Sequence, residues 1–194
     1  MEILRKNEIK KAVSILKSGG IIIYPTETSY GLGCDYTNKK AVRKIYKIKG
    51  RSKGKPFITL VDNIKMAKKY GIINKIAIKL INKFMPGPLT LIVKGKKSEE
   101  FTFRISSNKI ANSLVKSLGK PLVSTSANIS GKRPFYNSKN AIKQFDENVD
   151  AIIDAGKIPK IKPSTVVKVH DKKIIIIREG VISNKKIMNT VRGS

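Results

Sequence analysis

The sequence reads Pro25-Thr26-Glu27-Thr28-Ser29-Tyr30-Gly31-Leu32-Gly33 directly after the apolar run of residues 21–24. The apolar run has the length and the isoleucine content of a buried strand. Hydroxyl groups and glycines dominate the stretch that follows, as they do in turns and loops. Because open α/β sheets bind small ligands where their strands end, we expect this stretch to be a loop that lines a ligand site.

A second polar stretch, Ser124-Thr125-Ser126-Ala127-Asn128-Ile129-Ser130-Gly131, follows a short strand that we expect to end at Ser124. A helix N-cap needs only one hydroxyl or amide side chain, whereas each stretch carries several. Hydroxyls and amides can bind a carboxylate or a phosphate without changing their own charge near neutral pH. The two stretches therefore predict a site for an anionic ligand.

Apolar residues recur at helical and strand spacing along the whole chain. We expect helices around residues 9–16, 41–48, 76–84, 110–118 and 141–145, and N-caps at Asn7, Asn38 and Asn108. Further strands are expected at residues 57–61, 89–93, 101–105, 151–153, 165–169 and 174–177, the last two as a hairpin turning at residues 170–172. Helix-connected strands and hairpins in one chain predict an α/β fold with a mixed parallel and antiparallel sheet.

The 194 residues, 40% of them hydrophobic, suffice for one well-buried core. We expect a single domain over residues 1–194, with a core at about residues 5–182 and a short C-terminal tail. One cysteine, Cys34, and one histidine, His170, exclude the common zinc sites and a disulfide framework. The N-terminus lacks the apolar core of a signal peptide, and no apolar run is long enough to span a membrane. We therefore expect a cytoplasmic protein that binds neither a membrane nor a metal of its own.

Lys and Arg number 41 against 13 Asp and Glu, which gives a formal net charge of +28. A surface this cationic attracts polyanions such as nucleotide phosphates, RNA or anionic lipid. The lysines are spread along the chain, so general solvation explains the charge as well as a dedicated nucleic-acid face does. Aromatic residues make up 6% and tryptophan is absent, so stacking platforms for single strands are not conspicuous.

The turn at residues 49–56 imitates a Walker phosphate loop without completing it, because Pro56 stands where a Ser or Thr is needed. In an extended turn, alternate side chains point to one side, so four cations could converge on phosphate oxygens: Lys49, Arg51, Lys53 and Lys55. A solvated basic turn is the alternative reading of the same spacing.

Two arginines end strand-like runs: Arg104, and Arg178 after four isoleucines. Each is either a charged residue of an edge strand with its guanidinium exposed to solvent, or a guanidinium that makes two hydrogen bonds to a carboxylate or phosphate. His170 falls at the tip of the expected hairpin. We therefore expect it on the surface and not in a Ser-His-Asp triad.

Six short motifs make the chain resemble the YrdC-like family, the threonylcarbamoyl-AMP synthases of tRNA modification. The family's P-T-E-T-x-Y-G-L-G and K-x-R motifs are matched at residues 25–33 and 49–51. Its P-G-P-L-T, S-A-N-x-S-G, S-T-[VI]-[VI] and R-x-G motifs are matched at residues 86–90, 126–131, 164–167 and 178–180. The motifs follow the family order across almost the whole chain, and six motifs in order are far more specific than any one of them. The chain resembles the short, single-domain members of the family.

The resemblance implies a twisted mixed sheet with flanking helices and a basic concave face that holds ATP and L-threonine. It also implies the reaction: the threonine amine combines with bicarbonate, and the new carboxylate attacks the α-phosphate of ATP, giving threonylcarbamoyl-AMP and pyrophosphate. Positioning and charge stabilisation would supply the catalysis, and Mg²⁺ is expected on the ATP phosphates. The product would supply the threonylcarbamoyl group for the adenosine next to the tRNA anticodon, and the implied partner is a downstream threonylcarbamoyl transferase.

Carried over residue by residue, the resemblance assigns the threonine site to Thr26, Thr28, Arg104, Ser124 and Ser164. It assigns the ATP site to Lys49, Arg51, Lys55, Ser126, Asn128 and Arg178, with Lys49 and Arg51 as the catalytic residues. The chain departs from longer relatives at four places. Leu60 stands where they have His, Met85 where they have Trp, and Ser52 where they have Pro. Pro134-Phe135-Tyr136 stands where they have Ser-Pro-Thr. Pro134 cannot reproduce a serine contact to the nucleotide, so we expect that part of the pocket to differ.

Two other functions stay open on the sequence alone. One is a non-catalytic protein that binds double-stranded RNA or tRNA in the same basic cavity, with an affinity that falls steeply with salt. The other is a relative that makes a different carbamoyl-adenylate, as the similar domain of hydrogenase maturation proteins does. The polar stretches favour the synthase, because binding of a phosphate backbone alone has little use for Thr28, Asn128 and Ser164 in one pocket.

Overall fold

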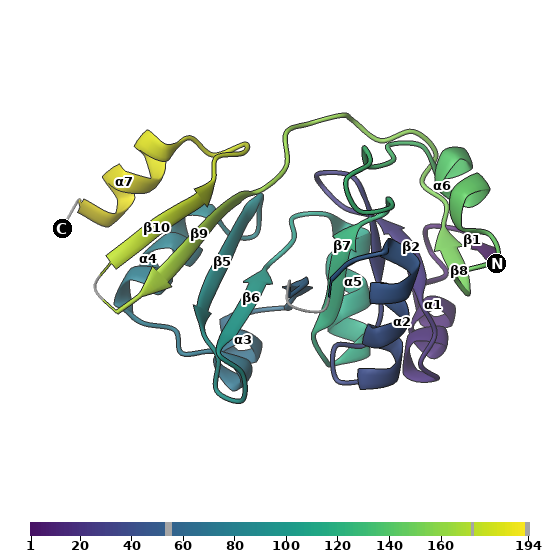
Figure 1. The fold of residues 1–194 in the computed structure, drawn as a ribbon, viewed down its shortest axis with the longest axis horizontal. Coiled ribbons are helices and arrows are strands. Elements are labelled where there is room, and N and C mark those ends of the chain that lie inside the picture. Colours follow the sequence, from purple (N-terminus) through teal and green to yellow (C-terminus); the bar gives the residue numbers. More distant parts are fainter. Residues whose placement is uncertain (53–55, 172, 193–194) are drawn as a thin grey trace.

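The computed structural model describes residues 1–52, 56–171 and 173–192. Its strands are β1 (Glu2–Leu4), β2 (Ile22–Pro25), β3 (Tyr30–Gly33), β4 (Ile58–Leu60), β5 (Leu89–Lys94), β6 (Glu100–Arg104), β7 (Leu122–Ser126), β8 (Ala151–Ile153), β9 (Thr165–His170) and β10 (Lys173–Arg178). Its helices are α1 (Ile9–Lys17), α2 (Lys39–Lys49), α3 (Ile64–Tyr70), α4 (Lys75–Phe84), α5 (Lys109–Leu118), α6 (Ser138–Phe145) and α7 (Asn184–Arg192). The strands form one sheet in the order β1-β8-β2-β3-β7-β4-β6-β5-β9-β10 (Figure 1).

The sheet mixes both strand directions, which confirms the predicted α/β class. β8 pairs in parallel with β1 and β2, β4 pairs in parallel with β6, and β5 pairs in parallel with β9. The other neighbours are antiparallel, including the β2–β3 and β9–β10 hairpins. Chain segments that are distant in sequence, such as β3, β7, β4 and β6, therefore lie side by side in the middle of the sheet.

The sheet has two differently covered halves (Figure 1). In the half with β2 and β8, Ile22 and Tyr24 pack with residues of α1 and α5, whereas Ile23 packs with residues of α2 and α6. Successive residues of a strand face opposite sides, so β2 is buried on both faces. In the other half, α3, α4 and α7 share a third apolar cluster with β5, β6 and β9.

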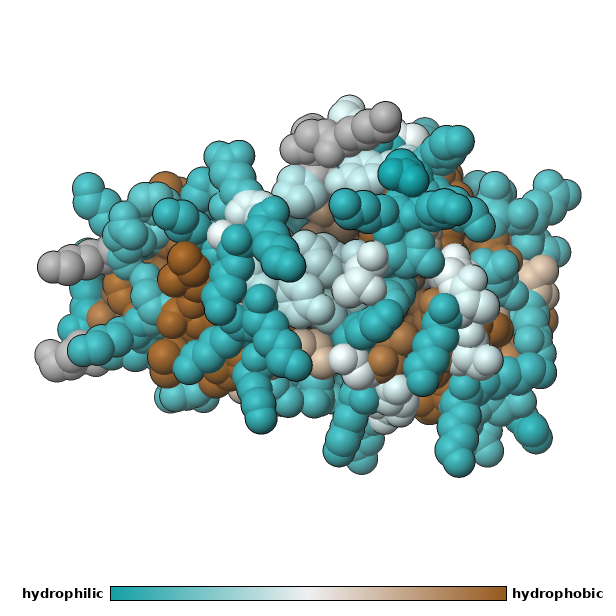
Figure 2. Space-filling view, turned by 90° about the horizontal axis from the view of Figure 1, so that it is seen from below, coloured by the Kyte–Doolittle hydropathy of each residue, from teal (hydrophilic) through white to brown (hydrophobic). Residues whose placement is uncertain are grey.

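The half with β9 and β10 leaves one face of the sheet open. Ile174 and Ile176 pack into the apolar cluster beneath α4 and α7, whereas Ile175 and Ile177 are 54% and 55% exposed. Figure 2 shows brown, apolar surface among the hydrophilic side chains at this end of the molecule. No described helix is long and apolar enough to cross a membrane.

Asparagine side chains begin most of the helices by accepting hydrogen bonds from backbone N–H groups that the first turn leaves free. Asn38 and Asn108 do so as predicted, and the same contact is made by Asn63, Asn74 and Asn137. The predicted cap at Asn7 is wrong, because the N-cap of α1 is Glu8, which makes no side-chain cap bond. Its carboxylate instead accepts the Arg5 N–H at 2.8 Å, which tightens the turn before the helix.

The first polar stretch is only partly the predicted loop, since its second half forms β3. Gly31 and Leu32 pair with β7, which also runs past the expected end at Ser124 as far as Ser126. A Cβ on Gly33 would lie 2.3 Å from the Val123 carbonyl oxygen. The glycines therefore allow two strands to approach each other closely. In the sequence alone, such glycines resemble those of a loop.

The buried core extends beyond the expected range of residues 5–182. Leu4 of β1 and Ile187 of α7 are both fully buried, and α7 lies where a tail was expected. The strand β1 and the helices α3 and α7 have few residues with a clear apolar period, which is why sequence analysis missed them. That the chain is a single domain stays a prediction.

Candidate active site

A cavity of about 430 Å³ lies where the two halves of the sheet meet. Most of the sequence-predicted site residues line it: Thr26, Thr28, Arg51, Arg104, Ser124, Ser126, Asn128, Ser164 and Arg178. They come from the β2–β3 turn, the ends of β6, β7 and β10, the turn after α2, and the segment between β8 and β9. The sheet order brings these elements together, because β3, β7, β4 and β6 are neighbours.

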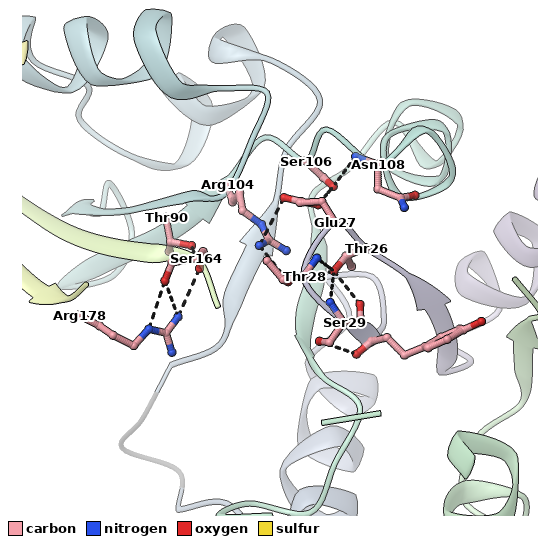
Figure 3. Close-up of polar contacts among 11 residues, drawn as sticks. Thr26, Glu27, Thr28, Ser29, Thr90, Arg104, Ser106, Asn108, Ser164 and Arg178 are labelled. Atoms are coloured by element: carbon pink, nitrogen blue, oxygen red, sulfur yellow. Dashed lines mark hydrogen bonds and ion pairs between the residues drawn. The ribbon is translucent and has the colours of Figure 1, made fainter. Parts of the chain in front are cut away.

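The β2–β3 turn is held by the hydroxyl of Thr26. Thr26 Oγ1 donates to the Ser29 carbonyl oxygen at 2.7 Å and accepts the N–H groups of Thr28 and Ser29 at 3.2 and 3.3 Å. A side-chain hydroxyl that bonds its own turn in this way fixes the backbone. Thr26 therefore shapes the wall, and Thr28 presents its hydroxyl to the cavity beside Arg104 (Figure 3).

Arg104, at the end of β6, is 4% exposed yet lines the cavity. Its Nη1 lies 3.4 Å from Glu27 Oε1 and donates to Thr28 Oγ1 at 3.5 Å. Neither Arg104 Nε nor Glu27 Oε1 has a hydrogen-bond partner among the described residues. A buried guanidinium with unused donors suits a carboxylate ligand, which can accept two parallel hydrogen bonds.

Arg178 forms the opposite wall together with Ser164. Its Nε and Nη2 donate to the Ser164 carbonyl oxygen at 3.2 and 2.9 Å, and the Ser164 hydroxyl lies 2.9 Å from Thr90 Oγ1. Burial, and then the charge of Arg104, lower the pKa of Arg178 from its ordinary value. An anion bound between the two arginines would relieve this repulsion.

The segment between β8 and β9 crosses from one half of the sheet to the other (Figure 1), and its residues Ile161, Pro163 and Ser164 line the cavity. We call residues 154–164 the crossing segment. The Tyr30 hydroxyl holds its first end by donating to the Gly156 carbonyl oxygen at 2.9 Å. The other end is held by the Val181 N–H, which donates to the Pro163 carbonyl oxygen at 3.0 Å.

Gly180→Ala is expected to displace the crossing segment, because a Cβ at Gly180 would lie 2.1 Å from the Pro163 carbonyl oxygen. Overpacking against backbone costs about 3 kcal/mol. Gly119→Ala is the matched control, since Gly119 has a φ of +70° but open space around a Cβ, and left-handed backbone costs about 1 kcal/mol. Urea unfolding of both variants measures the two losses. A smaller loss for Gly180→Ala than for Gly119→Ala would contradict the packing assigned to the crossing segment.

Lys49 lies behind the cavity wall and does not line it. It is the last residue of α2 and is 2% exposed. Its Nζ donates to the carbonyl oxygens of Ser126 and Asn128 at 2.6 and 2.8 Å and to Asn128 Oδ1 at 3.2 Å. Burial, and then the charge of Arg51, lower the pKa of Lys49 to about 8. Lys49 thus shapes the second polar stretch from behind.

Of the two readings left open for the basic turn, the convergence of four cations does not include Lys49, because α2 is still helical there and alternate residues do not share a side. Arg51 does line the cavity, with its guanidinium carbon 5.2 Å above the centre of the Phe57 ring. Lys53 and Lys55 lie outside the described residues, so their part of the prediction is not tested.

Sequence reasoning missed several residues around the cavity. Ser106 bonds to Glu27, and Thr90, inside the P-G-P-L-T motif, contacts Ser164. Pro134 and Tyr136 line the cavity in the part of the pocket that we expected to differ, and Leu60, another of the four departures, is buried in the core. No single residue type marks these positions in the sequence.

Two residues considered for other chemistry lie away from the cavity. His170 is exposed at the end of β9, as predicted. Cys34 is buried, and burial raises the pKa of its thiol to about 12. Within the described residues, no group of three His, Cys, Asp or Glu side chains could hold a metal ion.

The Sua5, YciO and YrdC family, described as "Telomere recombination", matches residues 14–180. The chain belongs to this family. A Methanocaldococcus jannaschii protein, provisionally named as a threonylcarbamoyl-AMP synthase, is 41% identical over 195 residues, which cover 95% of this chain and 93% of that protein. A Psychromonas ingrahamii relative named threonylcarbamoyl-AMP synthase is 33% identical, and the match covers 79% of this chain and 87% of that relative. These names support an enzyme.

Solved structures of the family have the same fold. P. abyssi Sua5 complexed with L-threonine matches with a TM-score of 0.91 and 26% identity over 99% of this chain. The chain spans about 60% of the length of that Sua5 chain. E. coli YciO matches with a TM-score of 0.86 and 29% identity over 96% of this chain and 98% of YciO. The curated name of E. coli YciO states no activity.

Proposed function

We propose that this chain makes L-threonylcarbamoyl-AMP and pyrophosphate from L-threonine, bicarbonate and ATP. The observation that carries the proposal is that Arg104, Arg51 and Asn128, which are far apart in the sequence, line one cavity. The synthase names of relatives and the threonine complex of P. abyssi Sua5 support it. A cavity lined by cations and hydroxyls suits two anionic substrates that must lie side by side.

The proposed reaction has two steps. The threonine amine attacks bicarbonate, a C–N bond forms, and water leaves to give the N-carboxy compound. One oxygen of this carboxylate then attacks the α-phosphorus of ATP, and the bond to the pyrophosphate oxygen breaks. Negative charge gathers around one phosphorus, so fixed guanidinium groups and exact placement of the substrates supply the catalysis without a protein nucleophile. Mg²⁺ would accompany the ATP phosphates.

The positions around the cavity suggest a division of labour. Arg104 and Thr28 lie together at the β2–β3 turn, where the threonine carboxylate would bind with help from Ser124 and Ser164. ATP would lie along a second group of residues: Arg51, Ser126, Asn128 and Arg178. Thr26 and Lys49 would act through the backbone that they hold. The product would pass to a transferase that modifies tRNA.

The test is release of pyrophosphate from L-threonine, bicarbonate and ATP, with each substrate left out in turn. Arg51→Ala is expected to lower kcat at least about 100-fold, because one charge-stabilising donor at the reacting phosphate is lost. Arg43→Ala, which removes an equal charge from the exposed face of α2, is expected to leave the rate unchanged. Thermal unfolding of both variants shows whether the fold is kept.

Two results would contradict the proposal. One is pyrophosphate release that does not depend on threonine. The other is tight, salt-sensitive binding of tRNA by a folded protein that releases no pyrophosphate, which would favour the RNA-binding alternative.

A further inference from the structure

Glu27 is the one acidic residue of the first polar stretch, and the proposed reaction gives it no role. Its side chain points toward Ser106 and Arg104 (Figure 3), and it is not one of the residues that line the cavity. Glu27 Oε2 accepts the Ser106 hydroxyl at 2.5 Å, and Ser106 Oγ also accepts the Asn108 N–H at 3.2 Å. Because Asn108 is the N-cap of α5, the start of that helix fixes the carboxylate in place.

The other oxygen of Glu27 faces the Arg104 guanidinium. Glu27 Oε1 lies 3.4 Å from Arg104 Nη1 and makes no hydrogen bond among the described residues. A loose ion pair of this kind supplies charge compensation for a buried guanidinium without saturating its donors. Arg104 Nε likewise has no hydrogen-bond partner in the part of the chain that the structure describes. The carboxylate therefore holds Arg104 while leaving it donors for a ligand.

Arg104 lies between Glu27 on one side and Arg178 on the other (Figure 3). The two arginines carry like charges and repel each other; burial, and then this repulsion, lower the pKa of Arg178. Each is held to its own wall, Arg178 by Ser164 and Arg104 by Glu27 and Thr28. Without the carboxylate, the Arg104 guanidinium would be free to turn toward the strongest anion in the cavity, which would be the triphosphate.

We propose that Glu27 is a positioning residue that keeps Arg104 at the Thr28 side of the cavity, so that Arg104 binds the carboxylate of the amino-acid substrate and Arg178 binds phosphate. Glu27 thereby divides one cationic cavity into two anion sites. This inference rests on the proposed function, because it assumes an amino acid and a nucleotide bound together.

Glu27→Gln tests the proposal, since it keeps the side-chain length and an oxygen for the Ser106 hydroxyl but removes the charge. The KM for L-threonine is expected to rise about tenfold, because the donors of Arg104 are no longer aimed at the substrate carboxylate. The KM for ATP is expected not to rise. Glu147→Gln, the same change at an exposed position after α6, is expected to alter neither value. Should Glu27→Gln fail to fold, Ser106→Ala is expected to shift the threonine KM in the same direction by a smaller factor.

A double-mutant cycle distinguishes positioning from a purely structural role. In an Arg104→Lys background the guanidinium fork is gone, so Glu27→Gln is expected to raise the threonine KM by less than about threefold. An equal factor in both backgrounds would overturn the proposal. So would a Glu27→Gln variant that loses thermal stability but keeps its threonine KM.

Calorimetric titration with L-threonine separates this inference from the proposed function. If the wild-type chain binds threonine but releases no pyrophosphate, the proposed function fails, and the effect of Glu27→Gln on threonine affinity still decides the positioning role. If the wild-type chain binds no threonine, both proposals fail.

Discussion

Arg104→Ala is expected to lower kcat/KM for L-threonine about 1000-fold, because truncating one member of a buried charge pair that also contacts substrate removes several kcal/mol. Glu27 would keep a buried carboxylate without its counter-ion, so the free energy of unfolding is expected to fall by about 3 kcal/mol as well. Steady-state pyrophosphate release at saturating ATP measures the first effect, and urea unfolding measures the second. Assays at low temperature keep the variant folded.

Arg104→Lys is the companion variant. A lysine keeps the charge beside Glu27 but loses the planar fork, so the threonine KM is expected to rise about 10- to 100-fold with a smaller loss of stability. The KM for ATP is expected to stay within about threefold of the wild-type value, since we propose that Arg104 binds the amino acid and not the nucleotide. An Arg104→Ala variant with the wild-type threonine KM would show that threonine binds elsewhere.

Lys49→Met is expected to have the second largest effect. It leaves the carbonyl oxygens of Ser126 and Asn128 buried without their donor, which is expected to cost about 2 kcal/mol at neutral pH. The loop that carries Asn128 would shift, and misplacement by about 1 Å can cost about 100-fold in rate. We therefore expect kcat/KM for ATP to fall about 100-fold, with thermal unfolding and pyrophosphate release as the two measurements.

The pH dependence of stability identifies the charge state of Lys49. Because the pKa of Lys49 in the folded chain, about 8, lies below its ordinary value of 10.5, unfolded chains bind more protons within this window. The free energy of unfolding therefore gains a contribution as the pH rises above 8, and this contribution is lost as the pH falls through 8. The difference in unfolding free energy between wild type and Lys49→Met is expected to grow by about 1 kcal/mol from pH 8 to pH 9. A constant difference would mean that the pKa of Lys49 is not lowered.

Local signals in the sequence predicted much of the fold. Asn38 and Asn108 cap helices as expected, because an N-cap requires only the side chain and the next three residues. The strands with β-branched runs were also found, since burial on two faces produces continuous apolar sequence. The error at the first polar stretch involves a partner that is distant in the sequence. β3 is a strand because β2 and β7 lie on either side of it, and its glycines permit that approach.

The candidate site shows the same difference between features that are local in the sequence and features that depend on distant residues. Motifs identified Arg51 and Asn128, and the end of a strand-like run identified Arg104; the structure brings these three to one cavity. The bond between Ser106 and Glu27 joins residues 79 positions apart, so no local pattern could predict it. Lys49 carries a motif signal, but its burial behind the second polar stretch depends on where α2 ends. Sequence therefore indicated which residues gather around the cavity more reliably than where each side chain lies in it.

The account depends on one cavity holding an amino acid beside a nucleotide. A crystal structure of the chain with L-threonine and a non-hydrolysable ATP analogue tests this most directly. We expect the threonine carboxylate within hydrogen-bond distance of Arg104 and Thr28, and the triphosphate between Arg51 and Arg178 in the same cavity. Threonine bound outside this cavity, or a nucleotide whose phosphates occupy the Arg104 side, would contradict the account.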